Sequence, residues 1–111
     1  MLAARVPTLT VAHVTDDMHL VDVREADEWA AGHAPGAQHL PMSQLVGRLT
    51  EVPRDREVVV VCRSGHRSAH VVAYLRHHGW HHVHNLDGGM RDWAASGRPM
   101  VAEGGGAPQV L

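Results

Sequence analysis

Short apolar segments alternate along this chain with segments whose apolar residues recur at helical spacing. The apolar segments predict five strands, which we place at residues 6–9, 19–23, 38–40, 57–62 and 82–86. The intervening segments predict helices at residues 10–16, 26–31, 43–49, 68–78 and 89–95. Strands and helices that alternate in this way form βα units. The pattern therefore predicts an α/β fold in which helices cover both faces of a parallel sheet.

Polar residues come at the ends of three predicted strands. Asp22 and Arg24 lie where one strand ends, and Cys62 ends the strand made of four valines. Asp87 begins the loop after the last strand. Ligands of open α/β sheets bind at the carboxyl ends of the strands. We therefore expect these polar groups to converge on one edge of the sheet and to form the active site there.

Cys62 is the only cysteine, and the residues that follow it are Arg63, Ser64, Gly65, His66, Arg67 and Ser68. Guanidinium groups and the N–H groups at the start of a helix lower the pKa of a nearby thiol. Gly65 allows the loop to turn its N–H groups inward toward an anion. A lone cysteine is more often a small structural hydrophobe. The arginines, the glycine and the serines favour instead a reactive thiolate at the mouth of an anion-binding loop.

Composition limits the other classes of protein. A chain of 111 residues suits a single domain, and a net charge of −2 gives no indication of nucleic acid or membrane binding. One cysteine cannot form an internal disulfide, and the first eleven residues lack the apolar core of a signal peptide. We therefore predict a cytoplasmic protein. The glycines at 104–106 predict a flexible tail at 102–111 after a domain at 1–101.

Four sequence motifs together resemble the single-domain rhodanese family of thiosulfate sulfurtransferases. They are Asp22-Val23-Arg24 with Glu28-Trp29, Gly32-His33-Ala34-Pro35-Gly36-Ala37, the loop from Cys62 to Ser68, and Leu86-Asp87-Gly88-Gly89-Met90 with Trp93. The resemblance implies a three-layer α/β/α fold with a five-stranded parallel sheet. It also implies that Cys62 carries a persulfide cradled by the backbone N–H groups of residues 63–67. Asp22, Arg24 and His33 would be structural residues beside the site.

The reaction implied is a ping-pong sulfur transfer without cofactor or metal. Sulfane sulfur would move from thiosulfate or a similar anionic donor to Cys62, and then to cyanide or a cellular thiol. The sequence does not indicate a protein partner.

Two other functions use related features. Phosphatases and arsenate reductases of related fold hold an oxyanion with a cysteine loop and an arginine, but their loops place five residues between the two. Here four residues separate Cys62 from Arg67, and this tighter loop favours sulfur over a phosphoryl group. A non-catalytic interaction module is the second alternative, although such modules usually lack the cysteine.

Histidines gather near the end of the predicted helix at 68–78. They are His77, His78, His81, His82 and His84. Imidazole binds zinc, copper and nickel, but the spacing matches no known structural zinc pattern. We therefore predict no metal site there.

Overall fold

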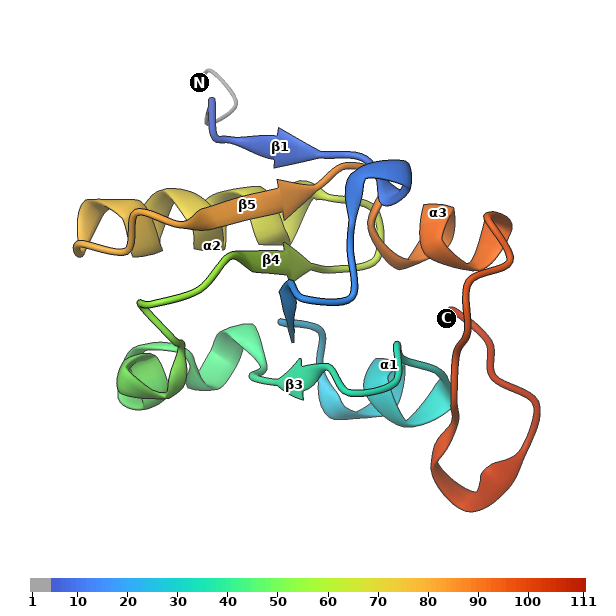
Figure 1. Ribbon diagram of the computed structural model, residues 1–111. Coiled ribbons are helices and arrows are strands. Elements are labelled where there is room, and N and C mark those ends of the chain that lie inside the picture. Colours follow the sequence, from blue (N-terminus) through green and yellow to red (C-terminus); the bar gives the residue numbers. More distant parts are fainter. Residues whose placement is uncertain (1–4) are drawn as a thin grey trace.

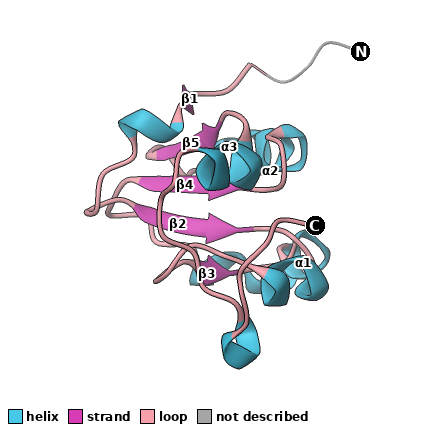
Figure 2. Ribbon diagram, turned by 90° about the vertical axis from the view of Figure 1, so that its right-hand side faces the viewer, coloured by secondary structure: helices cyan, strands magenta, loops and turns pink. Residues whose placement is uncertain are grey.

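The computed structural model describes residues 5–111, and its five strands form one parallel sheet (Figure 1). The strands are β1 (Thr8–Leu9), β2 (His19–Asp22), β3 (Gln38–His39), β4 (Val58–Val61) and β5 (Val83–Leu86). Their order across the sheet is β1-β5-β4-β2-β3, as Figure 2 shows. The predicted α/β fold with a five-stranded parallel sheet is confirmed, and the valine strand lies at its centre.

Within residues 5–111, three α-helices and four short 3-10 helices lie between and after the strands. The α-helices are α1 (Ala26–Ala31), α2 (His66–His77) and α3 (Gly89–Ala95). The 3-10 helices are η1 (Val11–His13), η2 (Met42–Gln44), η3 (Val46–Glu51) and η4 (Glu103–Gly105). None of the helices within residues 5–111 has the length and apolar character needed to cross a membrane.

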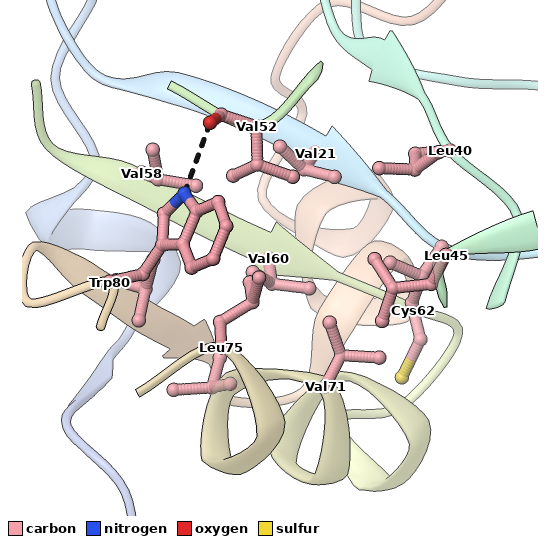
Figure 3. Close-up of a cluster of buried hydrophobic side chains, with 13 residues drawn as sticks. Val21, Leu40, Leu45, Val52, Val58, Val60, Cys62, Val71, Leu75 and Trp80 are labelled. Atoms are coloured by element: carbon pink, nitrogen blue, oxygen red, sulfur yellow. Dashed lines mark hydrogen bonds between the residues drawn. The ribbon is translucent and has the colours of Figure 1, made fainter. Parts of the chain in front are cut away.

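The core consists of two apolar clusters, one on each face of the sheet. Because successive strand residues point to opposite faces, Val58 and Val60 pack in one cluster, while Val59 and Val61 pack in the other. Residues of α2 complete the first cluster, and residues of α3 complete the second. Cys62 continues the alternation on the α2 side (Figure 3). The thiol therefore starts from a rigid, buried strand.

Several predicted element boundaries were wrong. The helix predicted at 10–16 is only the three-residue η1, and the one predicted at 43–49 is a pair of 3-10 helices. The helix predicted from Ser68 begins at His66, because Gly65 adopts a φ of +106° and completes the turn early. The strands stop one or two residues short of six of their ten predicted limits. Sheet pairing, which the sequence pattern does not specify, decides where each strand ends.

Residues 102–111 follow the surface back toward the domain. The Gln109 N–H donates a hydrogen bond of 2.9 Å to the Ala31 carbonyl at the end of α1. Just before this segment, Val101 and His33 form a two-bond antiparallel bridge. Val110 packs against the cluster on the α3 side. The flexibility of the tail stays a prediction, but its points of contact are defined.

Candidate active site

The loop after β4 is held from behind by the start of α3. The Met90 N–H donates to the Cys62 carbonyl at 2.8 Å, and the Arg91 N–H donates to the Arg63 carbonyl at 3.0 Å. Gly89 makes this approach possible: a Cβ atom there would lie 2.3 Å from the Cys62 carbonyl oxygen, and its φ is +52°. The Gly-Gly pair at 88–89 thus brings the end of β5 against the cysteine loop.

The Cys62 thiol lies inside the loop, and the residue is only 1% exposed. The Gly65 N–H donates a hydrogen bond of 3.1 Å to Sγ, and the Ser68 Oγ lies 3.2 Å from it. Burial raises the pKa of the Cys62 thiol, but hydrogen bonds from the Ser68 hydroxyl and from the N–H groups of Ser68, Gly65 and Ser64 together lower it below its ordinary value. The site therefore favours the thiolate, which is the nucleophilic form.

Asn85, on β5, is a site residue that the sequence reasoning missed. Its Oδ1 accepts a hydrogen bond of 2.5 Å from the Ser68 hydroxyl, and its Nδ2 donates to the Gly65 carbonyl at 3.3 Å. Asn85 is 6% exposed and so joins both residues that bond the thiol of Cys62. The available signal was an amide side chain in a predicted strand, next to Leu86, where a buried polar group needs partners.

Arg67 makes an ion pair that the sequence did not predict. Its guanidinium donates two hydrogen bonds, of 2.9 and 2.8 Å, to the carboxylate of Glu28 on α1. The same carboxylate accepts a hydrogen bond from the Glu25 N–H and so caps the start of α1. These bonds hold the pKa of Glu28 at about 2, with the Arg67 hydrogen bonds as the largest cause. Arg67 thus ties the loop to α1, while Arg63, Ser64 and His66 are exposed at the mouth.

Asp22 and Arg24 form a fully buried ion pair at the end of β2. The Arg24 Nη2 lies 2.8 Å from the Asp22 carboxylate and also donates to the Gly32 carbonyl at 2.7 Å. The His33 Nδ1 lies 2.7 Å from the Trp29 carbonyl, and the two rings stack at 3.6 Å. Because these groups bond one another and the end of α1, the geometry fits a structural role beside the site.

The histidine cluster does not assemble into a metal site. Among the residues from 5 onward, no three His, Cys, Asp or Glu side chains come close enough together to hold a metal ion. His82 and His84 face the Glu57 carboxylate at 3.2 and 3.7 Å.

A cavity of about 560 Å³ lies near the amino ends of β2 and β4, lined in part by His19 and Arg56. None of the residues that line this cavity belongs to the cysteine loop.

Comparisons with known proteins agree with this geometry. The sequence model of one protein family, the rhodanese-like domain, matches residues 9–96. A sulfurtransferase of Allochromatium vinosum is 47% identical over 91 residues, which cover 82% of this chain and 85% of the relative. The crystal structure of a rhodanese-related protein from Thermoplasma volcanium superposes with a TM-score of 0.82 at 28% identity, covering 87% of this chain and 99% of that one. A NAD-dependent persulfide reductase from A. fulgidus, at 36% identity and a TM-score of 0.68, matches 79% of this chain over 16% of its own length.

Proposed function

Because this chain belongs to the rhodanese-like domain family, we propose that it transfers sulfane sulfur through a persulfide on Cys62. Sulfur transfer is the general activity that its sulfurtransferase relative supports. The observation that carries the proposal is the environment of the thiol. The Gly65 N–H at 3.1 Å and the Ser68 hydroxyl at 3.2 Å both contact Sγ at the end of a buried strand.

In the first half-reaction, the Cys62 thiolate attacks the sulfane sulfur of thiosulfate or a similar anionic donor. A new S–S bond forms to Cys62 as the S–S bond of the donor breaks, and sulfite leaves with the bonding electron pair. Once Cys62 is ionised, no further proton has to move, because sulfite leaves as a stable anion. The backbone N–H groups of residues 63–67 would bind the charged outer sulfur of the product.

In the second half-reaction, an acceptor attacks the outer sulfur and Cys62 leaves as the thiolate. Cyanide would give thiocyanate, and a thiolate would give a new persulfide, so neither transfer needs an oxidant or a reductant. The chain has one cysteine, and a second thiol that could take over the sulfur within the same chain is therefore lacking. The acceptor must come from outside.

The geometry of Arg67 supports sulfur transfer over phosphoryl transfer. A phosphatase of related fold needs its loop arginine to face the oxyanion, but both terminal nitrogens of Arg67 already bond Glu28. The short loop, with four residues between Cys62 and Arg67, leaves less room for three phosphoryl oxygens than for one sulfur atom. Hydrolysis of an aryl phosphate without any sulfur transfer would reverse this ranking.

Intact-mass spectrometry after treatment with thiosulfate tests the proposal. We expect the wild-type chain to gain the mass of one sulfur atom and to lose it again on addition of cyanide. The Cys62→Ser variant, with a hydroxyl in place of the thiol, should gain nothing. A wild-type chain that stays unmodified with thiosulfate and with other persulfide donors would rule out the persulfide on Cys62.

A further inference from the structure

A shallow apolar groove lies beside the cysteine loop, between α2 and the 3-10 helices that follow β3. Its volume is about 300 Å³, and it is lined by Met42, Leu45, Val46, His70, Val71 and Tyr74. Two of its apolar side chains are open to solvent, Val46 at 73% and Met42 at 38% exposure. A surface on which exposed apolar residues gather around a groove binds another molecule more often than a surface without such residues.

The groove is continuous with the surroundings of the thiol. Leu45 and Val71 line the groove and also pack in the same buried cluster as Cys62. In Figure 3 these three side chains lie together at the end of β4. On α2, His66 of the loop and His70 of the groove are four residues apart and share one helix face. A molecule seated in the groove therefore lies next to the loop that holds the sulfur.

Basic side chains are exposed in the loop and in the groove. Arg63 and His66 belong to the loop and His70 lines the groove, and none of them is within ion-pair distance of a carboxylate in the described part of the chain. Arg67, in contrast, is neutralised by Glu28. A partner that fits this surface combines an apolar side chain with a nearby negative charge.

We propose that this groove docks the sulfur acceptor, and that the acceptor is a protein segment carrying a thiol beside apolar and acidic side chains. The inference rests on the proposed function. Cyanide and thiosulfate are small polar anions that gain nothing from an apolar groove. Because Cys62 is 1% exposed, a larger acceptor has to be held so that its thiolate reaches into the loop. That thiolate attacks the outer sulfur, one S–S bond replaces another, and Cys62 leaves as the thiolate.

Two synthetic peptides test this docking surface. Each has one central cysteine and two glutamates, and leucines flank the cysteine in one peptide where serines flank it in the other. Burial of one leucine side chain corresponds to about tenfold or more in affinity. We expect kcat/KM for sulfur transfer to be about tenfold higher with the leucine peptide. In the Val46→Asp variant this preference should disappear, while turnover with cyanide stays at the wild-type rate.

Leu111→Asp is the matched control, because Leu111 is an exposed apolar residue (47%) outside the groove. It should keep the preference for the leucine peptide. Equal kcat/KM for the two peptides in the wild type, or a preference that survives Val46→Asp, would overturn the docking proposal. A dimer in sedimentation that Val46→Asp dissociates would also overturn it, since a second copy would then cover the groove. If the wild type does not turn over cyanide at all, that result would instead count against the persulfide on Cys62.

Discussion

Ser68 has one hydroxyl proton and two neighbours that can accept it. The Ser68 Oγ lies 2.5 Å from the Asn85 Oδ1, to which it can donate, and 3.2 Å from the Cys62 Sγ on the other side. A protonated thiol can donate to the Ser68 oxygen, but a thiolate can only accept. When Cys62 ionises, the Ser68 hydroxyl therefore has to rotate its proton from the Asn85 side-chain amide toward the sulfur in order to bond the thiolate. Asn85 competes with the thiolate for this hydrogen bond.

This competition has a definite direction. The Ser68→Ala variant should raise the pKa of Cys62, because a hydrogen bond to the thiolate is lost, and should slow alkylation by iodoacetamide at neutral pH by up to about tenfold. The Asn85→Leu variant should lower the pKa of Cys62, because Ser68 is then free to donate to sulfur. The rate of alkylation against pH measures both effects. An unchanged or higher Cys62 pKa in the Asn85→Leu variant would contradict the competition. The same conclusion would follow if Asn85→Leu still lowered the Cys62 pKa in a chain that also carries Ser68→Ala.

Glu28 gives a second test at the level of one residue, in the dependence of stability on pH. Its pKa in the folded chain is about 2, below the ordinary value of 4.5. Its ion pair with Arg67 is therefore fully present above about pH 4.5 and is lost as the pH falls toward 2. Because Arg67 is 37% exposed, water screens the pair, and we expect Glu28→Gln to lower the free energy of unfolding at pH 7 by about 1–2 kcal/mol.

Urea unfolding at pH 7 and at pH 3 measures this difference. The gap between wild type and Glu28→Gln should shrink at the lower pH. The Glu51→Gln variant is the control, because Glu51 forms an exposed ion pair with Arg48 away from the loop and should change stability at pH 7 by less. A gap for Glu28→Gln that is the same at both pH values would mean that the charge of Glu28 contributes nothing.

At the scale of elements, the sequence predicted the site best where the residues of the site are neighbours along the chain. The valine strand, Cys62 and Gly65 lie within eight residues, and their local pattern predicted a buried strand that delivers a thiol to a turn. Glu28 and Asn85 were not predicted, because they reach the loop across 39 and 17 residues of sequence. The bond from Asn85 to Ser68 depends on which strand pairs with β4, and that from Glu28 to Arg67 depends on where α1 packs. The local pattern of apolar and polar residues predicts neither of these arrangements.

Short elements were predicted least well for a related reason. β1 and β3 have two residues each, and both are edge strands whose length is set by their neighbours. The segment at 42–51 forms 3-10 helices instead of the predicted α-helix. Its apolar residues satisfy both spacings over so short a stretch. The side chain of Leu45, within this segment, is buried.

At the scale of the whole molecule, the last residues of the chain return to α1 and close one side of the domain. A Cβ atom on Gly32 would lie 2.5 Å from the Gln109 carbonyl oxygen and 2.8 Å from its nitrogen. The Met100 Cε would lie 2.9 Å away, but it is the end of a flexible side chain. Gly32 has extended backbone angles that other residues adopt, so the close approach of these atoms, and above all of the Gln109 backbone, requires the glycine. The close approach depends on a segment far away in sequence, and for this reason the sequence predicted only a flexible tail.

A pair of variants tests this contact. Gly32→Ala should destabilise the full chain by about 1–3 kcal/mol through overpacking. The same substitution should cost clearly less in a chain that ends at residue 105, because Gln109 is then absent. Thermal unfolding of the four proteins measures both values. An equal cost of Gly32→Ala in the full and the shortened chain would mean that residues 106–111 do not rest on α1 in solution.

The bonds between α3 and the cysteine loop have a consequence for how this site can change. Both of them join main-chain atoms: the N–H groups of Met90 and Arg91 and the carbonyls of Cys62 and Arg63. Substitutions that keep this backbone path leave both bonds in place, and the exposed side chains at 63, 64 and 66 make no part of them. The position of Cys62 therefore depends on main-chain atoms, which are separate from the side chains at the mouth of the loop. Substitutions of those side chains can change the surface of the mouth without moving Cys62.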